Sequence, residues 1–233
     1  LCASRIGRHE DKLESQIFPK SGVTKLISPR SQISNKHKLI FIHIPKCGGT
    51  SIDNSNLFEP GKFGHTTYRE FCRMLGVSIS SYKVFALTRN PWDRLASAFY
   101  YLSEGGDGKI WDLQDSEYLK DFDFNFQSFL DTFIENPQKY LILKHFKPQI
   151  NFVNPNEVSI PFYFHQLENI KDITPLKDFL NFDIKIEHLR KRKNYDKVRK
   201  TFNDFYFRKV KEIYSQDIKA FNYENHTLDM IKN

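Results

Sequence analysis

Three short, densely apolar runs divide this chain and predict the strands of a buried sheet. They lie at residues 39–44 (LIFIHI), 83–88 (KVFALT) and 158–165 (VSIPFYFH). Runs of this length and density are typical of parallel strands that are covered on both faces. Because segments with helical spacing separate them, the sequence predicts an α/β fold with an open, mostly parallel β-sheet flanked by helices.

The helices are predicted from the spacing of their apolar residues and from signals at their ends. One helix should begin at Thr66 or Thr67 and end at Gly76, and a longer one should begin at Pro91, which suits a first helical turn. Further helices are expected at 122–133, 174–182 and 201–221.

The apolar pattern begins only near residue 38, which suggests how the chain is divided. Residues 1–37 are polar and basic, and they predict a loosely ordered arm with residues 22–27 as a candidate edge element. Residues 38–233 are then expected to form a single domain, long enough for a full core. Such an arm is usually only solvated, and a binding role is the alternative.

The net charge of the chain favours anionic partners but does not identify which kind. The chain has 35 Lys and Arg against 28 Asp and Glu, a formal charge of +7, and a pI near 9.1. This balance attracts nucleotide phosphates, acidic glycans, nucleic acid or an anionic membrane. Its three cysteines cannot build a disulfide framework, which favours a reducing compartment. No apolar run reaches the ~20 residues that span a bilayer, and no signal-peptide pattern is visible.

The first candidate site is the turn that follows the first strand. Pro45 ends the strand, and the turn into the next helix consists of Lys46, Cys47, Gly48, Gly49, Thr50 and Ser51. Adjacent glycines let the backbone approach a ligand, and the free N–H groups of a first helical turn attract an anion. With the charge of Lys46 added, the turn predicts a phosphate-binding loop. Its order differs from the Walker pattern, in which the lysine follows the glycines.

A second candidate site follows the second strand. Arg89 ends that strand, at the edge where open α/β sheets bind ligands, and its guanidinium fork suits a phosphate. Ser97 lies two turns into the next helix and can turn back over the same strand end. The alternative is an arginine paired with Asp93 and a serine that only packs.

The two blocks together, IPKCGGTS and TRNPWDRLASAF, resemble the donor-binding blocks of the sulfotransferases. The likeness is greatest to the carbohydrate branch, which includes the chondroitin and heparan sulfate enzymes and small bacterial relatives. It implies the P-loop-like sheet of the sulfotransferase fold and, as donor, 3′-phosphoadenosine 5′-phosphosulfate (PAPS), with PAP as product. It also implies that residues 46–51 hold the 5′-phosphosulfate, and that Arg89 and Ser97 hold the 3′-phosphate.

The same resemblance suggests a base and residues that contact the acceptor. Gly64-His65 is similar to the Gly-His of the uronyl 2-O-sulfotransferases, in which the histidine is the base. Because His65 follows Lys46 after only one expected helix and a loop, both could face the same cleft. The alternative is a surface or capping histidine beside a helix N-terminus. The candidate acceptor contacts are His145, Lys147 and Gln149, since family members often have a glutamine near this point. The alternative is a solvated loop.

The basic run at residues 188–200 admits three interpretations. Charge runs are usually solvated faces, and a nucleic-acid patch is an alternative. In the sulfotransferases a basic loop folds over the donor nucleotide at this point. That interpretation makes Arg192 and Lys193 the candidate donor contacts.

The prediction is therefore a PAPS-dependent enzyme that moves a sulfuryl group to a hydroxyl, with a carbohydrate as the favoured acceptor. Lys46 would stabilise the leaving phosphate oxygen and His65 would accept the acceptor proton. No metal and no nucleic-acid partner are expected. The alternatives are an ATP-dependent small-molecule kinase, a nucleic-acid-binding protein that uses residues 188–200, and an inactive protein of this fold.

A bacterial-type cytoplasmic enzyme is expected, with a Golgi-luminal one that has lost its anchor as the alternative. The oligomeric state stays open.

Overall fold

The structure is a computed structural model that describes residues 29–53, 55–58, 63–184, 186 and 200–232. Several sequence predictions lie wholly or mostly outside the described residues: the arm up to residue 28 with its edge element at 22–27, and the basic run at 188–200 with the donor contacts Arg192 and Lys193. None of the helices in the described part of the chain is both long and apolar enough to cross a membrane.

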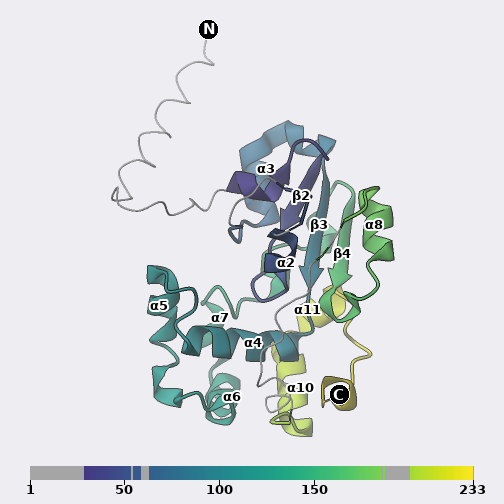
Figure 1. Cartoon of the computed structure of the whole chain (residues 1–233). Helices are drawn as coiled ribbons and strands as arrows, with labels where there is room; N and C mark the ends of the chain where they lie inside the picture. The colour runs from purple at the N-terminus through teal and green to yellow at the C-terminus, as the bar shows by residue number, and fades with distance from the viewer. Residues whose placement is uncertain (1–28, 54, 59–62, 185, 187–199, 233) are drawn as a thin grey trace.

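The centre of the fold is a four-stranded sheet in the order β1-β2-β3-β4 (Figure 1). β2 (Leu39–Ile42), β3 (Lys83–Thr88) and β4 (Phe162–Gln166) run parallel, and β1 (Ile33–Ser34) pairs antiparallel with β2. β2 is buried along its whole length and β3 nearly so, as their dense apolar runs require. The predicted open, mostly parallel α/β sheet is confirmed.

Helices account for most of the remaining described residues. In chain order the α-helices are α2 (Gly49–Asp53), α3 (Tyr68–Leu75), α4 (Pro91–Ser103), α5 (Ile110–Ser116), α6 (Phe126–Glu135), α7 (Pro137–Leu141), α8 (Thr174–Leu180), α10 (Asp204–Ile213), α11 (Ser215–Ala220) and α12 (Leu228–Lys232). Short 3-10 turns are η1 (Pro29–Gln32), η2 (Gly76–Ser81), η3 (Lys120–Phe122), η4 (Gln149–Asn151), η5 (Pro155–Glu157) and η6 (Leu167–Asn169).

Local capping explains where two site-bearing helices begin. Thr67 accepts a hydrogen bond from the backbone N–H of Glu70 and donates its own N–H to the Glu70 carboxylate, at 2.7 Å, which is a capping box. Asn90 caps α4 by accepting from the N–H of Asp93, and Pro91 takes the first helical position. Both predicted starts are confirmed, with Thr67 as the cap of α3.

Some boundaries differ from the sequence predictions. The third strand begins at Phe162, four residues late, because Pro161 has no N–H to donate and contributes only its carbonyl, which accepts from Val84 at 2.8 Å. The helix expected at 122–133 begins at Phe126, since the side chain of Asn125 caps it. Residues 29–34, which the sequence placed in the basic arm, form η1 and β1.

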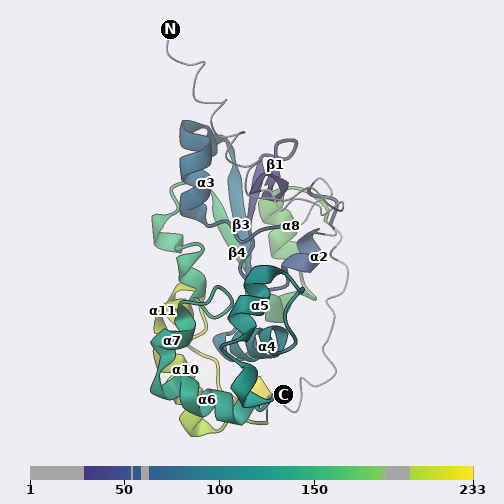
Figure 2. The ribbon, with the colours of Figure 1, turned by 90° about the vertical axis from the view of Figure 1, so that its left-hand side faces the viewer.

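The helices form two groups around the sheet. Figure 2 shows α3 on one side of the strands and α2 with α8 on the other. The arrowheads of β3 and β4 point toward a second, helical half that contains α4, α7 and α11 (Figure 1). The carboxyl ends of the parallel strands therefore face the junction of the two halves, where ligands bind in open α/β sheets.

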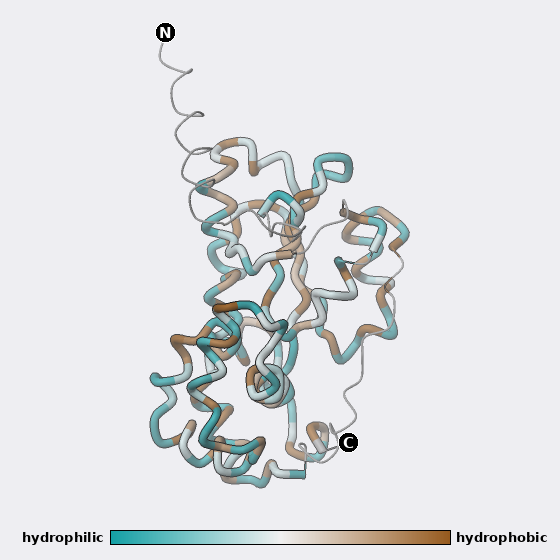
Figure 3. The backbone as a smooth tube through the Cα atoms, turned by 60° about the vertical axis from the view of Figure 1, so that its left-hand side comes forward, coloured by the Kyte–Doolittle hydropathy of each residue, from teal (hydrophilic) through white to brown (hydrophobic). Residues whose placement is uncertain are grey.

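Aromatic rings form much of the core of the helical half. The ring centroid of Phe129 lies 4.8 Å from Phe99, 5.6 Å from Phe133, 5.4 Å from Phe146 and 5.3 Å from Tyr140. All five side chains are fully buried. Hydrophobic stretches recur both in the strands and in these helices (Figure 3). The helical half thus has a packed core that can hold the strand ends in a fixed arrangement.

Candidate active site

The loop between β2 and α2 has the backbone conformation that the two glycines suggested. Gly48 has φ 83, and Lys46 also lies in the left-handed region with φ 67. This conformation is easy for glycine and uncommon for lysine, where it costs on the order of 1 kcal/mol or more. The chain turns sharply on both sides of Cys47, and α2 begins directly at Gly49.

Gly49 is required by its neighbour His43. A Cβ at position 49 would lie 1.9 Å from Nε2 of His43, so no other residue fits without movement. Of the next two residues, Thr50 is exposed and Ser51 is buried. The N–H groups at the start of α2 have no carbonyl partner within the helix. The loop therefore brings a lysine and the start of a helix together in one short segment, as a phosphate-binding turn would. The N–H of Ser51 is used within the loop, where it donates to Gly48 O at 3.1 Å.

Arg89 lies beside this loop at the end of β3. Its Nη1 donates to the carbonyl oxygen of Lys46 at 3.3 Å. Its backbone is fixed by Gln149, whose Oε1 accepts from Arg89 N at 3.0 Å and whose Nε2 donates to Arg89 O at 2.8 Å. Ser97, on α4, is half-buried between the buried residues Ala96 and Ala98. The two predicted donor-binding blocks are thus adjacent in space.

Gln149 is a predicted acceptor contact, but its amide is turned into the protein and bonded to Arg89. It is fully buried, and its Oε1 also accepts from the Cys47 thiol at 3.2 Å. Oδ2 of Asp217 accepts a hydrogen bond from the backbone N–H of Gln149 at 2.7 Å and so fixes the position of this residue. Both amide atoms are used within the protein, so Gln149 joins the two blocks to each other.

Cys47 can serve the site only through its backbone. Its side chain is buried, and burial raises the pKa of the thiol to about 12. The thiol is therefore protonated at neutral pH and faces the interior.

Three histidine rings lie in a row beside the loop. The ring centroids of His43 and His65 are 4.3 Å apart, and those of His65 and His145 are 6.0 Å apart. His43 donates from Nδ1 to Gly64 O at 3.1 Å, and His65 donates from Nδ1 to His43 O at 2.9 Å. Because a carbonyl oxygen only accepts, Nδ1 carries the proton in both rings. The lone pair is then on Nε2, the atom that a general base would use.

Burial keeps these rings neutral. It lowers the pKa of His65 to about 3, with the nearby His145 and Lys144 adding to the effect. It also lowers the pKa of His145 to about 3, where Lys46 contributes next. The pKa of His43 is held well below its usual value by burial and then by His65. The buried Nδ1 of His145 has no hydrogen-bond partner among the described residues.

The side chain of Lys46 packs on an aromatic ring of α4. Its Nζ lies 3.7 Å from the centroid of the Tyr101 ring, a cation–π contact. Tyr101 donates its hydroxyl proton to Oδ2 of Asp112 at 2.8 Å. The same ring lies 4.8 Å from the ring of His145. Tyr101 thus contacts both the predicted donor-binding lysine and a predicted acceptor residue.

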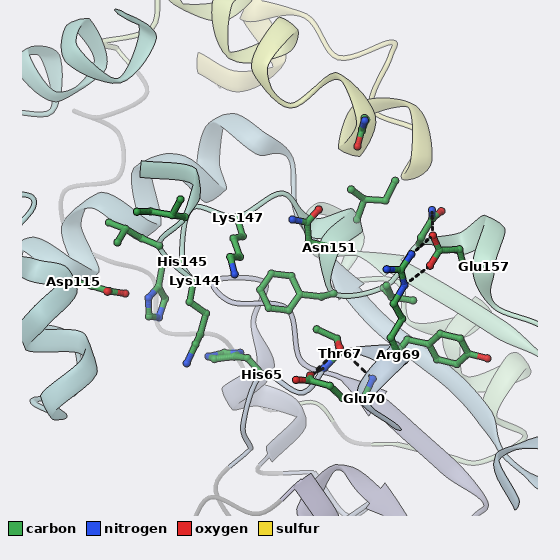
Figure 4. Close-up of a pocket in the computed structure, with 18 of the residues that line it drawn as sticks. His65, Thr67, Arg69, Glu70, Asp115, Lys144, His145, Lys147, Asn151 and Glu157 are labelled. Carbon is green, nitrogen blue, oxygen red and sulfur yellow. Dashed lines mark hydrogen bonds and ion pairs between the residues drawn. The ribbon is translucent and has the colours of Figure 1, made fainter. Parts of the chain in front are cut away.

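A pocket of about 780 Å³ opens beside the histidines. His65, Lys144 and His145 lie together at one end of it (Figure 4). An ion pair between Arg69 and Glu157, with Nη2 and Oε1 2.7 Å apart, lies at the opposite end. The predicted base His65 and two of the three predicted acceptor residues, His145 and Lys147, therefore line the same pocket.

Two further lining residues add a cation and an aromatic surface to this pocket. Lys147 lies between the two ends (Figure 4). Trp111 also lines it, and Nζ of Lys144 lies 5.9 Å from the Trp111 ring centroid. The lining therefore offers an aromatic surface with cations beside it.

Several residues at this site were missed by sequence reasoning. His43 had a detectable signal, because it is the polar residue within an otherwise apolar strand run. Tyr101 and Asp112 had none, since their contact depends on the turn that brings α5 back against α4. Within the described residues, no group of three or more His, Cys, Asp and Glu side chains is arranged to hold a metal ion.

Comparison with known proteins agrees with this geometry. A model of the sulfotransferase family matches residues 29–224, which include both predicted donor-binding blocks and the residues that line the pocket. No curated protein and no solved structure gave a significant match. The match covers most of the sequence and confirms the resemblance that the two blocks indicated. The chain belongs to the sulfotransferase family, whose members are PAPS-dependent transferases.

Proposed function

We propose that this protein transfers the sulfuryl group of PAPS to a hydroxyl of a carbohydrate bound in the pocket beside His65. The observation that carries the proposal is the arrangement of His65 next to the phosphate loop. Its Nδ1 proton is bonded to the carbonyl oxygen of His43, so Nε2 is available as a base. The ring lines the pocket, and Lys46 lies close to its neighbour His145.

The residues at the strand ends suit an anionic nucleotide. Lys46 and Arg89 supply positive charge on adjacent segments, and the start of α2 supplies backbone N–H donors. In this assignment Lys46 and the first turn of α2 hold the 5′-phosphosulfate, while Arg89 and Ser97 hold the 3′-phosphate. PAPS, when bound, supplies the sulfuryl group, whose bond to the 5′-phosphate oxygen breaks as the bond to the acceptor oxygen forms.

Two side chains take part directly in the proposed reaction. Lys46 stabilises the negative charge that develops on the leaving phosphate oxygen. His65 takes the proton of the acceptor hydroxyl on Nε2. With a pKa of about 3, His65 is neutral but only weakly basic. Negative charge close to an imidazole raises its pKa, so the donor's own charge should make His65 a stronger base.

The pocket supports a carbohydrate acceptor. Its volume of about 780 Å³ lies within the range of roughly 300–1,000 Å³ typical of small-ligand sites. Trp111 offers a flat apolar surface on which a sugar ring can pack, and Lys144 and Lys147 offer donors for hydroxyl or acidic groups.

Calorimetry with PAP, 5′-AMP and ATP tests the donor part of the proposal. Wild-type protein should bind PAP with micromolar affinity and 5′-AMP much more weakly, and Arg89→Ala should lose the preference for PAP. ATP binding as tight as PAP binding would favour a kinase. No nucleotide binding at all would contradict the proposal.

The acceptor part needs a transfer assay with labelled PAPS and a panel of neutral and acidic oligosaccharides, small alcohols and lipids. Transfer to a carbohydrate that is lost in both Lys46→Ala and His65→Ala is the expected result. Exclusive transfer to a non-carbohydrate alcohol would contradict the acceptor class and retain the reaction.

A further inference from the structure

We propose that Tyr101 and Asp112 are positioning residues that hold the ammonium group of Lys46 at the donor site. Neither residue belongs to the two donor-binding blocks, and neither is a group that reacts. The inference rests on the proposed role of Lys46 at the leaving oxygen. The contact with Tyr101 explains how the flexible side chain of Lys46 can be held in one position near the leaving oxygen.

The first observation is the contact itself. Nζ of Lys46 lies 3.7 Å from the centroid of the Tyr101 ring, well within the roughly 6 Å over which a cation is attracted to an aromatic face. A lysine side chain has several rotatable bonds and loses much rotamer freedom when it is held. A ring that already holds the ammonium group reduces the freedom that has to be lost during the reaction.

The second observation is that the ring is itself held. The hydroxyl of Tyr101 donates to Oδ2 of Asp112 at 2.8 Å, and the same oxygen accepts from the backbone N–H of Asp107 at 3.2 Å. Asp112 is only 2% exposed. The hydrogen bond therefore fixes the plane of the Tyr101 ring against α5.

The turn between α4 and α5 is shaped around this carboxylate. Gly106 has φ +64, and a Cβ on it would lie 2.6 Å from Cβ of Asp112. Its backbone N–H donates to the carbonyl oxygen of Tyr101 at 2.8 Å. The glycine thus allows the close approach that brings Asp112 to the Tyr101 hydroxyl.

Hydrogen bonding also affects the strength of the contact. A phenol that donates to a carboxylate has a more negative ring face, and this strengthens its attraction for a cation. Burial, and then Asp112, raises the pKa of Tyr101, so the phenol keeps its proton. Tyr101 therefore presents its ring face to Lys46, while its hydroxyl is occupied elsewhere.

The kinetic test compares substitutions at Tyr101 with one at an exposed tyrosine. Tyr101→Leu should lower kcat about tenfold and change PAP affinity less than about threefold, because the lost contact positions Lys46 for the transition state. Tyr101→Phe keeps the ring but loses its hydrogen bond to Asp112, so it should recover kcat only in part. Tyr118→Leu is the matched control, since Tyr118 is 40% exposed, and it should behave as wild type.

A double-mutant cycle separates positioning from a structural effect. If Tyr101 acts through Lys46, then Tyr101→Leu should cost little further activity in a Lys46→Ala background. A loss as large as in the wild-type background would contradict the inference. So would a Tyr101→Leu variant whose kcat equals that of wild type.

A measurement without turnover makes the result independent of the proposed reaction. Reductive ¹³C-methylation of the lysines keeps their charge, and the Lys46 signal is assigned by its absence in Lys46→Arg. Ring-current shielding above the Tyr101 face should move this signal upfield, and Tyr101→Leu should remove the shift. An unshifted wild-type signal would overturn the inference even in an active enzyme. Lack of PAP binding would instead contradict the proposed function and leave the shift unchanged.

Discussion

The guanidinium of Arg89 donates a hydrogen bond from Nη1 to the carbonyl oxygen of Lys46, 3.3 Å away. This bond joins the end of β3 to the loop that follows β2. Lys46 has a left-handed backbone conformation, which needs support from its surroundings. The residue assigned to the 3′-phosphate therefore also stabilises the loop assigned to the 5′-phosphosulfate. A substitution at Arg89 should therefore also weaken binding at the Lys46 loop.

Arg89→Lys should show how much of this depends on the guanidinium fork. Lysine keeps the charge but cannot make two parallel hydrogen bonds to a phosphate. PAP affinity should fall about 10- to 100-fold. The affinity for 5′-AMP, which lacks the 3′-phosphate, should fall less than about tenfold, because it loses only the support that Arg89 gives to the Lys46 carbonyl. Calorimetry with both ligands measures the difference. Equal losses for the two nucleotides would exclude a direct contact between Arg89 and the 3′-phosphate.

Gln149→Ala should weaken folding and donor binding together. The substitution leaves the backbone N–H and carbonyl of Arg89 without their amide partners in a buried region. A loss of about 2–4 kcal/mol in the free energy of unfolding is expected from unpaired polar groups and the cavity. Urea denaturation measures it, and PAP affinity should fall in the same variant.

Lys147→Ala is the matched control from the same segment. Its side chain lines the pocket, and the hydrogen bond that Arg94 donates to it uses the backbone carbonyl, which the substitution keeps. This variant should retain wild-type stability and PAP affinity and should raise KM for the acceptor. Reversed results, with stability lost at position 147 and kept at 149, would contradict the roles assigned to the two residues.

Gly49→Ala should distort the phosphate loop through a clash with one neighbour. The new Cβ would lie 1.9 Å from Nε2 of His43. Overpacking of this kind costs about 1–3 kcal/mol, and PAP binding should weaken with it. Adding His43→Ala removes the clashing ring, so the double variant should be more stable than the sum of the single changes predicts. Strict additivity of the two unfolding free energies would argue that the clash is relieved in another way.

The parts of the site that the sequence could predict are those encoded locally. Lys46 follows one apolar run and Arg89 follows another. Because parallel strands end at the same edge of a sheet, the proximity of these two residues could be expected from the sequence alone. The helix starts at Thr67 and Pro91 are local for the same reason, since the capping hydrogen bonds of Thr67 and the fixed φ of Pro91 act within one helical turn.

The parts that could not be predicted depend on contacts between distant segments. Whether the amide of Gln149 faces the pocket or the interior is decided by Arg89, 60 residues away. The contact between Tyr101 and Asp112 depends on how the α4–α5 turn closes. The two residues of β1 are too few to show a periodic pattern, and only their pairing with β2 makes them a strand.

Burial of neutral histidines should make the protein sensitive to acid. His145 is 4% exposed, and its pKa is lowered to about 3, against roughly 6.5 for an exposed imidazole. Between these two values the unfolded chain binds more protons than the folded one. The free energy of unfolding therefore rises with pH across this window. As pH falls from about 6.5 toward 3, the folded protein becomes progressively less stable. One such histidine contributes a slope of up to about 1.4 kcal/mol per pH unit.

Urea denaturation at several pH values between about 5 and 8 measures this slope. The free energy of unfolding should level off above about pH 7, where the imidazole is neutral in both states. His145→Gln should reduce the slope below pH 6.5, because glutamine does not titrate, whatever its effect on stability at pH 7. An unchanged slope in this variant would mean that His145 is protonated in the folded protein at mildly acidic pH. A protonated His145 would contradict the neutral ring that packs against Tyr101 and lies close to Lys46.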